Sequence, residues 1–434
     1  MKLLVFAHTP PPHPGQSYMV QLMFEGFGGD HRKRRHKAVP ENDAGAKHDI
    51  ECYHVNTRLS KRLEDIGEFR GAKLLLLLIY CMEAVWCRFR YGVTHFYYIP
   101  APGKKSALYR DWMVMFLCRL FFKKMIFHWH AAGLAKWLET VVQIRTRAMT
   151  YNLLKNVDMS IVLSNYNRPD AEKLFAHRVR VVGNGIPDPC PDFETNVLPR
   201  NLARLAARRK LLAGQPLNTP DLQGTGGDPE LFRVLFLAHC TREKGLFDTL
   251  GAVALANAQL ARGGSPIRVQ LTVAGEFIIP GEHAEFDQRT QQADLRSPSG
   301  QPCVRYIGFV SGEAKRRAFE ESDCFCFPTY YYAESFGLVV LEAMAFGLPI
   351  IASRWRSIPE LLAPDYPGLI PPRDPQKIAE VLVQMLPTAS AAPLRTHFLR
   401  HFTIEQHLIA LAKALHSVEQ PAGEISLAPA NCAS

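Results

Sequence analysis

Residues 324–353 read Cys-Phe-Cys-Phe-Pro-Thr-Tyr-Tyr-Tyr-Ala-Glu-Ser-Phe-Gly-Leu-Val-Val-Leu-Glu-Ala-Met-Ala-Phe-Gly-Leu-Pro-Ile-Ile-Ala-Ser, which predicts a strand, a loop, a helix and a second strand. The first strand is the apolar run 324–327, which stops at Pro328. Good helix formers follow at 338–345, and Gly347 with Pro349 behind it is typical of a helix C-terminus. Residues 349–352 are again apolar and β-branched, which favours a strand.

Two carboxylates belong to this stretch, Glu334 just before the helix and Glu342 two turns into it. A helix that follows directly on a strand presents free backbone N–H groups at the carboxyl edge of a sheet, where anions and above all phosphates are held. Because helical side chains lean toward the N-terminus, Glu342 should point back to the same edge. The plainer interpretation is that Glu334 only caps the helix dipole and Glu342 is solvated. The apolar character of the surrounding helix favours the functional interpretation.

The 434-residue chain has room for two domains, and its net charge of +10 is uneven. Residues 1–190 contain 28 Lys and Arg against 16 Asp and Glu, a balance of +12, and the remainder contains 23 against 25, a balance of −2. A basic first half indicates an anionic partner, such as a membrane surface, a phosphorylated acceptor or nucleic acid. Of these three partners nucleic acid is the least favoured, because the sequence contains no nucleic-acid-binding motif in which aromatic and basic residues are interleaved. The basic run 31–37 fits a solvated loop and a patch for anionic head groups equally well.

The ten cysteines show no pairing pattern and no Cys-x-x-Cys, so we expect neither a disulfide framework nor a zinc site, and a reducing cytosol fits. The N-terminal apolar run, which stops at Pro10, is too short for the apolar region of a signal peptide. The apolar stretches 74–82 and 112–127 are too short or too interrupted by charge to span a membrane. Each suits a buried helix or a helix lying face-on against a bilayer. We expect a cytoplasmic protein, with peripheral attachment to the inner face of the plasma membrane as the alternative.

Strands and helices alternate in two separate series, which predicts two parallel-sheet α/β domains facing each other across a cleft. We expect an N-terminal Rossmann-like domain at residues 1–190, a linker at 191–230 and a C-terminal Rossmann-like domain at 231–402. A final helix is expected at 403–416 and a flexible tail at 417–434, while 277–302 is interpreted as a variable loop. Ligands should bind where the carboxyl ends of the strands meet.

Three loops of the second domain should meet at one edge of its sheet, namely 239–245, 275–276 and 334–337. Arg242 and Lys244 beside a helix N-terminus can neutralise a diphosphate. Because carboxylates repel phosphate, Glu334 and Glu342 should face hydroxyl groups, those of a sugar and a ribose respectively. Such a set suits a nucleotide sugar. Since no Asp-x-Asp occurs, the basic side chains and the helix dipole are expected to supply the charge stabilisation that a metal gives elsewhere.

These motifs resemble those of retaining glycosyltransferases of the GT-B fold, most closely glycosyltransferase family 4 (glycosyl transferases group 1). The run from Glu334 to Glu342 is similar to the E-x7-E signature of that family. Glu243-Lys244-Gly245 resembles its Lys-Gly loop, and Asn184-Gly185-Ile186-Pro187-Asp188 resembles its Asn-Gly-(Val/Ile)-Asp turn with one inserted residue. Five further segments fall in the expected order: 273–275, 307–309, 327–329, 359–361 and 402–403.

The resemblance implies a GT-B fold in which the N-terminal domain, 1–190, binds the acceptor and the C-terminal domain, 231–402, binds the nucleotide-sugar donor. The last helix of that fold crosses back to the first domain. The resemblance also implies a retaining, metal-independent hexosyl-type transferase without a cofactor, acting on a UDP- or GDP-sugar and a glycan or lipid-linked acceptor in cell-surface polysaccharide or glycoconjugate synthesis. The implied catalytic residues are His130, Lys244 and Glu334. The implied donor-binding residues are Gly15, Arg242, Gly275, Glu276, Phe309, Ser335, Phe336, Gly337, Leu338 and Glu342.

Three features depart from the family pattern. His239 stands where the family has an arginine, for which Arg242 is the candidate substitute, and Gly15-Gln16-Ser17 replaces two adjacent glycines. The first domain matches weakly, which leaves the acceptor open. Near the predicted sugar site, His128 and His130 share one face of a strand, but two histidines without a third ligand make a poor metal site.

Two other functions stay open. A sugar-nucleotide epimerase with the GT-B fold would need further acids and bases around the sugar, and the sequence offers no such set. A catalytically silent nucleotide-binding protein is the second, because a fold does not fix a function. The presence of Lys244, Glu334 and Glu342 together favours a transferase.

Overall fold

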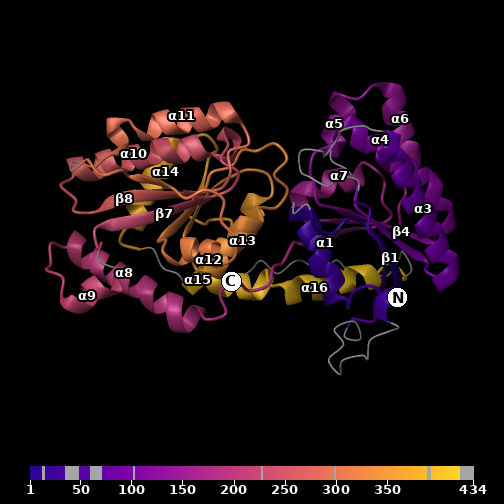
Figure 1. The fold of residues 1–434 in the computed structure, drawn as a ribbon, viewed down its shortest axis with the longest axis horizontal. Helices are drawn as coiled ribbons and strands as arrows, with labels where there is room; N and C mark the ends of the chain where they lie inside the picture. Colours follow the sequence, from indigo (N-terminus) through magenta and orange to yellow (C-terminus); the bar gives the residue numbers. More distant parts are fainter. Residues whose placement is uncertain are drawn as a thin grey trace. The chain divides into compact units, whose positions relative to one another are not determined.

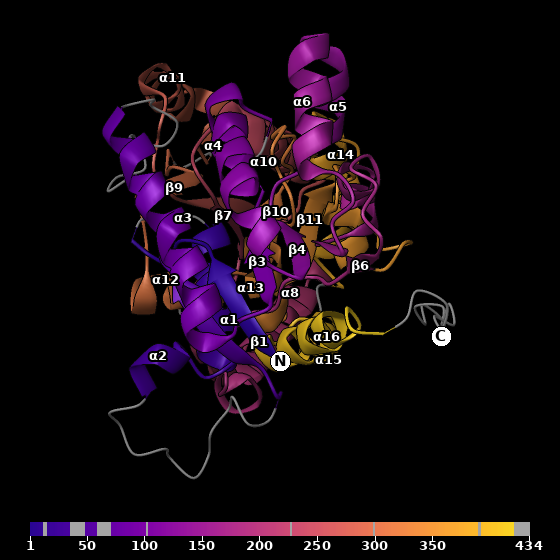
Figure 2. The same ribbon diagram turned by 90° about the vertical axis from the view of Figure 1, so that its right-hand side faces the viewer.

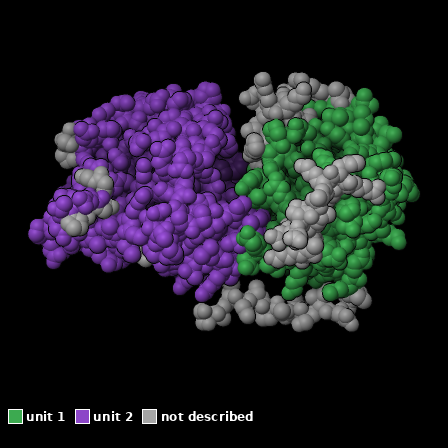
Figure 3. All heavy atoms as spheres, turned by 60° about the horizontal axis from the view of Figure 1, so that its bottom comes forward, with its two compact units in different colours: residues 1–184, 405–434 green, residues 185–404 purple. Residues whose placement is uncertain are grey.

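The computed structural model describes residues 1–11, 15–34, 48–58, 71–100, 103–225, 228–297, 300–388 and 392–420. The chain divides into two compact units (Figure 3). Unit 1 consists of Met1–Asn184 together with Glu405–Ser434, and unit 2 of Gly185–Ile404. Each unit contains a six-stranded parallel sheet with helices packed against it (Figure 1), as the alternating pattern predicts.

The sheet of unit 1 has the strand order β2-β1-β3-β4-β5-β6. Its strands are β1 (Lys2–Phe6), β2 (Glu51–Val55), β3 (His95–Tyr98), β4 (Lys124–Trp129), β5 (Met159–Val162) and β6 (Val179–Val181). Its helices are α1 (Gly15–Gly26), α2 (His31–Arg34), α3 (Gly71–Tyr91), α4 (Lys105–Cys118), α5 (Leu134–Thr140), α6 (Ile144–Leu154), α7 (Arg168–Glu172) and α16 (Ile404–His416), with short turns η1 (Arg119–Phe121) and η2 (Asn165–Asn167). Because helices cover the faces of such a sheet, its central strands are apolar on both sides, and residues 3–6 are all buried.

The sheet of unit 2 has the order β12-β11-β10-β7-β8-β9. Its strands are β7 (Leu231–Leu237), β8 (Arg268–Ala274), β9 (Val304–Tyr306), β10 (Cys324–Phe327), β11 (Ile350–Ser353) and β12 (Leu369–Ile370). Its helices are α8 (Leu198–Leu212), α9 (Thr219–Gly224), α10 (Leu246–Arg262), α11 (Pro280–Thr290), α12 (Gly312–Glu320), α13 (Leu338–Ala345), α14 (Pro375–Met385) and α15 (Ala392–His401), with short turns η3 (Phe193–Val197), η4 (Arg242–Lys244), η5 (Ala293–Leu295) and η6 (Ile358–Leu361).

The stretch 324–353 folds as predicted, with β10 and α13 at the expected residues. Gly347 ends α13 at φ +66°, where its N–H and that of Leu348 donate to the carbonyls of Met344 and Ala343. The strand β11 starts one residue later than predicted, since Pro349 has no N–H to donate and contributes only its carbonyl, to the Phe325 amide.

Two segments differ from the sequence-based expectation. The proposed linker 191–230 is part of unit 2, because Arg204 and Arg208 of α8 pair with the buried Asp323 at 3.0 and 2.8 Å. The proposed loop 277–302 contains α11, whose polar sequence buries only Phe286 and therefore carries little apolar periodicity. In addition, the helix α15 and the strand β12 were not predicted from the sequence.

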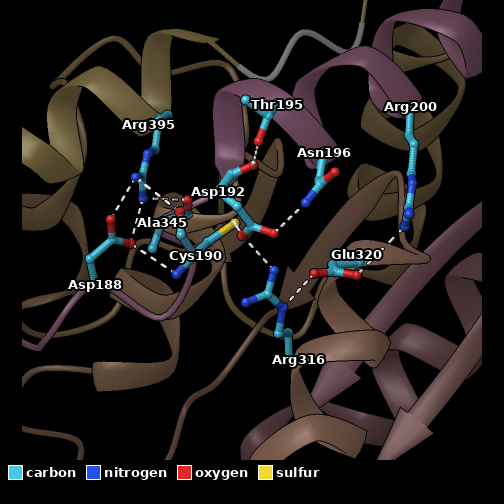
Figure 4. Close-up of polar contacts among 10 residues, drawn as sticks. All are labelled: Asp188, Cys190, Asp192, Thr195, Asn196, Arg200, Arg316, Glu320, Ala345 and Arg395. Atoms are coloured by element: carbon cyan, nitrogen blue, oxygen red, sulfur yellow. Dashed lines mark hydrogen bonds and ion pairs between the residues drawn. The ribbon is translucent and has the colours of Figure 1, made fainter.

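The turn 184–188 is tied to the rest of unit 2 by Arg395 of α15 (Figure 4). Its guanidinium makes two contacts with Asp188, at 2.7 and 2.6 Å, and donates to the carbonyls of Cys190 and Ala345. Arg316 of α12 pairs with Asp192 and with Glu320 nearby. Asp188, the last residue of the family-like turn, is therefore an anchor between the start of unit 2 and the end of α13.

The last helix, α16, belongs to unit 1, as the GT-B resemblance implies. Leu408 lies directly against Gly26 of α1. A Cβ added at Gly26 would lie 2.3 Å from the Leu408 side chain. The Nδ1 of His407 lies 2.7 Å from the Gly183 carbonyl, and Arg178 donates to the carbonyl of Val418. The predicted tail lies outside the described residues from 421 onward, as do residues 35–37 of the basic run.

Candidate active site

Two loops meet at the carboxyl edge of the unit 2 sheet because their strands, β7 and β10, are neighbours. The loop after β7 carries Lys244, and the loop after β10 leads to Glu334. The Tyr330 N–H donates to the Glu243 carbonyl over 2.7 Å. Gly245, at φ +85°, lies so close to the second loop that an added Cβ would be 2.5 Å from the Pro328 carbonyl oxygen. Glycine at 245 is therefore a packing requirement as well as the start of α10.

Lys244 and Glu334, two of the predicted catalytic residues, form an ion pair between these loops. The Lys244 Nζ lies 2.6 Å from the Glu334 Oε2, and the two side chains are 15% and 9% exposed. The same ammonium lies 4.7 Å from the centre of the Tyr331 ring. The Thr329 hydroxyl lies 3.5 Å from the same carboxylate oxygen. The site thus holds a largely buried cation against a carboxylate and an aromatic face.

Arg242 faces away from this pair. Its guanidinium pairs with Glu285 of α11 and stacks 4.4 Å from the centre of the Phe247 ring, and its own N–H donates to Glu282. The hydrogen bond to Glu285 raises the pKa of Arg242. The structure therefore does not bring Arg242 together with Lys244. The sequence analysis missed these two partners of Arg242, because it interpreted 277–302 as a loop, whereas Glu282 and Glu285 lie on the helix α11.

Gly275 and Glu276 join the loops after β7, β8 and β9. Gly275 adopts φ +144°, and an added Cβ would lie 1.8 Å from the Ala238 carbonyl oxygen. Its N–H donates to the Gly308 carbonyl, and the Glu276 carbonyl accepts from the Cys240 N–H. The side chains of Glu276 and Phe309 are exposed, the latter to 68%. This close approach of backbones permits no side chain at position 275.

The start of α13 is held by its neighbours. Gly337 precedes the helix at φ +83°, and an added Cβ would come within 2.7 Å of Ile358. Phe336 is buried, and the Ser335 carbonyl accepts a hydrogen bond from the Ser357 hydroxyl over 2.6 Å. The first turn, which begins at Leu338, contains no acidic residue, so the positive end of the helix dipole is not offset by its own sequence.

Glu342 has a partner that the sequence analysis missed. The Nζ of Lys315, on α12, lies 2.5 Å from the Glu342 Oε1. The two residues are 27 positions apart, on different helices, and no local pattern links them. Only the packing of α12 next to α13 would have indicated the pair.

His130 and Gly15 belong to unit 1. The His130 ring is buried, and its centre lies 4.3 Å from that of His128. Burial, with a smaller contribution from His407, lowers the pKa of His130 to about 3. Its Nε2 has no hydrogen-bond partner among the described residues. Gly15 is the exposed first residue of α1.

In the described part of the chain, no group of three or more His, Cys, Asp or Glu side chains is placed to hold a metal ion. The described cysteines are free and buried. No described helix combines the length and the apolar character needed to cross a membrane.

The amino-acid sequence is similar to those of known glycosyltransferases over part of its length. Amylovoran biosynthesis glycosyltransferase AmsK of Erwinia amylovora is 27% identical over 240 residues, which cover 49% of this chain and 56% of AmsK. Phosphatidyl-myo-inositol mannosyltransferase of Mycobacterium leprae is 35% identical over 118 residues, 25% of this chain and 31% of that protein. The matches thus span about half or less of the length of these relatives.

Solved structures resemble the chain over nearly its whole length. Sucrose-phosphate synthase from Thermosynechococcus elongatus has a TM-score of 0.61 at 17% identity, covering 96% of this chain and 99% of that structure. Anabaena Alr3699/HepE in complex with UDP has a TM-score of 0.58 at 15% identity, covering 96% and 100%. These likenesses establish the GT-B fold. The family model "Glycosyl transferases group 1" matches residues 222–396 of this chain.

Proposed function

We propose that this protein is a retaining glycosyltransferase that transfers a hexose from a nucleoside-diphosphate sugar to a glycan or lipid-linked acceptor. The observation that carries the proposal is the Lys244–Glu334 pair, at the point where the loops after β7 and β10 meet. A cation and an acid in contact can be separated by a ligand that offers a phosphate to one and a hydroxyl to the other. A nucleotide sugar offers both.

In the proposed reaction, Lys244 binds the donor diphosphate, and the amides at the start of α13 add their dipole. Negative charge grows on the diphosphate as its bond to the sugar C1 breaks, so fixed positive groups stabilise the transition state more than the ground state. Once the phosphate engages Lys244, Glu334 is released to accept a hydrogen bond from a sugar hydroxyl. Glu342, fixed by Lys315, accepts from a ribose hydroxyl.

The acceptor oxygen attacks C1 on the face that the diphosphate leaves, and the departing phosphate oxygen takes the acceptor proton. This route needs no protein base. It agrees with a buried His130 whose pKa of about 3 leaves it neutral at physiological pH. We assign the unpartnered Nε2 of His130 to a hydrogen bond with the sugar rather than to proton transfer.

The names of similar proteins guide the choice of substrates. HepE was determined in complex with UDP-glucose, which makes UDP-glucose the first donor to test. AmsK is named for amylovoran biosynthesis, and the mycobacterial relative for transfer to phosphatidyl-myo-inositol, which favours polysaccharide and lipid-linked acceptors. We propose action in cell-surface polysaccharide or glycoconjugate synthesis, in the cytoplasm or at the inner face of the plasma membrane.

The test is nucleotide release by the full chain from a panel of UDP- and GDP-sugars, with and without a lipid extract as acceptor. We expect release with one donor, unchanged by EDTA, and a product whose anomeric proton coupling matches that of the donor. Conversion of the donor to another sugar nucleotide without acceptor would identify an epimerase. Tight nucleotide binding without turnover of any donor would identify a silent binding protein.

A further inference from the structure

Helix α3 presents an apolar surface to the outside of unit 1. Leu75, Ile79, Met82, Trp86 and Phe89 are between 51% and 70% exposed. Their spacing of four, three, four and three residues places them within an arc of about 80°, since successive residues are about 100° apart on a helix. We call these five residues the apolar ridge. Surface helices normally turn polar side chains outward, and the outward side of α3 departs from this pattern.

The ridge is not needed to pack α3 onto unit 1. The opposite side of the helix supplies Leu77, Cys81, Ala84 and Cys87, all buried in the core of the unit. The helix is therefore apolar on two sides, one covered by the sheet and one exposed. An exposed apolar surface of this length marks a site of interaction.

The apolar surface extends beyond α3. The Phe89 ring contacts that of Phe121 in η1, with 6.1 Å between centres, and the adjoining Leu120 is 88% exposed. Arg88 donates to the Phe121 carbonyl over 2.8 Å and so fixes η1 beside α3. The helices α3 and α4 lie next to each other in unit 1 (Figures 1 and 2). The surface thus runs from one helix to the end of the next.

The segment of the sequence that carries the ridge and η1 is basic. Residues 71–136 contain ten Lys and Arg against two Asp and Glu, a balance of +8. Both acids are paired, Glu83 with Arg32 at 2.8 Å and Asp111 with Arg110 at 2.9 Å. Arg90 and Lys123, next to Phe89 and Phe121, are exposed. The basic side chains in this segment are therefore not neutralised by its own acids.

We propose that the apolar ridge inserts into the surface of an anionic lipid bilayer, while the basic residues beside it bind the phosphates of the lipid head groups. Aromatic and aliphatic side chains flanked by Lys and Arg are the composition of helices that lie in the membrane interface. Two copies of this surface would bring like charges together, which disfavours a second copy as the occupant. The inference concerns attachment alone and does not depend on the reaction proposed above.

Cosedimentation of the full chain with vesicles tests the proposal. We expect binding to vesicles of phosphatidylcholine with phosphatidylglycerol, and a reduction of at least tenfold in Met82→Glu and in Phe89→Glu. Both side chains are well exposed, at 65% and 70%, so these variants should fold. Ile144→Glu, on α6 of the same unit and 74% exposed, is the matched control and should bind like the wild type. Arg90→Gln with Lys123→Gln should weaken binding to these anionic vesicles severalfold.

Three outcomes would overturn the proposal. The first is a wild-type chain that does not bind the vesicles of phosphatidylcholine with phosphatidylglycerol. The second is equal binding by Met82→Glu and Ile144→Glu. The third is a wild-type dimer in sedimentation velocity that Met82→Glu converts to monomer, because the ridge would then be an interface between copies of the chain.

Discussion

Lys244 and Glu334 lie 90 residues apart in sequence, and their side chains meet at 2.6 Å between two loops of unit 2. Each is largely buried, so neither charge is well compensated by water. In the proposed reaction, binding of the donor diphosphate to Lys244 therefore competes with Glu334. This competition couples recognition of the phosphate to release of the acid that we assign to the sugar.

Replacing Lys244 by methionine should lower kcat/KM for the nucleotide sugar by about 100- to 1,000-fold, the range for loss of one group that stabilises developing charge. The substitution also leaves Glu334 buried without its cation, so the free energy of unfolding should fall by about 3 kcal/mol. Steady-state kinetics and urea denaturation measure the two effects. Lys136→Met, at an exposed position of α5, is the control. Wild-type turnover in Lys244→Met would remove Lys244 from the diphosphate site.

Replacing Lys315 by methionine should act on donor binding. Its ammonium fixes Glu342, to which we assign the ribose, so KM for the donor should rise about fivefold, or roughly 1 kcal/mol, with little change in kcat. Lys377→Met removes an exposed pair with Glu380 within α14 and should leave both constants unchanged. An equal loss in kcat and in kcat/KM would show that Lys315 acts in the transition state instead.

Gly275→Ala should destabilise unit 2 by several kcal/mol. The new Cβ would lie 1.8 Å from the Ala238 carbonyl oxygen, and φ +144° disfavours any L side chain. Gly281→Ala is the matched control, because no atom lies within 4 Å of its added Cβ and alanine favours the helix α11, by up to about 1 kcal/mol. Thermal or urea denaturation compares the two. Equal stability of both variants would contradict the close backbone approach at 275.

The histidines of unit 1 predict a loss of stability in acid. The pKa of His130 is lowered to about 3, and burial also lowers the pKa values of His128 and His407. Below pH 6.5 the unfolded chain takes up protons that the folded chain does not. The stability is therefore complete above pH 6.5 and falls as the pH drops toward 3, by about 1.4 kcal/mol per pH unit for each such histidine.

Urea denaturation at several pH values between 7.5 and 5 would measure this slope. His130→Asn should reduce the slope of the unfolding free energy against pH by about the contribution of one histidine. His177→Asn, at an exposed position, should leave it unchanged. An unaltered slope in His130→Asn would show that this ring is protonated in the folded protein.

Local sequence patterns were sufficient to predict the structure of a segment where the segment's own residues determine it. The strand, helix and closing glycine of 324–353 follow from apolar runs and from the properties of glycine and proline, and β10 and α13 lie where they were predicted. The meeting of the loops around Lys244 and Glu334 follows from parallel strands, whose carboxyl ends share an edge. The two sheets of the GT-B fold were predictable for the same reason.

Long-range pairing was not predictable. Lys315 with Glu342, Arg242 with Glu285, and Arg395 with Asp188 join segments that carry no pattern referring to each other. The polar α11 was taken for a loop because it buries only one large apolar side chain. The segment 191–230 was interpreted as a linker from its composition, although buried arginines of α8 attach it to unit 2 through Asp323.

Because α16 belongs to unit 1, it affects the order in which the two units can complete their folding during synthesis. Leu408 of α16 packs against Gly26, and His407 of α16 contacts the Gly183 carbonyl. Residues 1–184 therefore lack part of their packing until α16 has been synthesised. Unit 2 is continuous in sequence, from 185 to 404, and can close as soon as it leaves the ribosome. The unit whose synthesis starts first is therefore completed last.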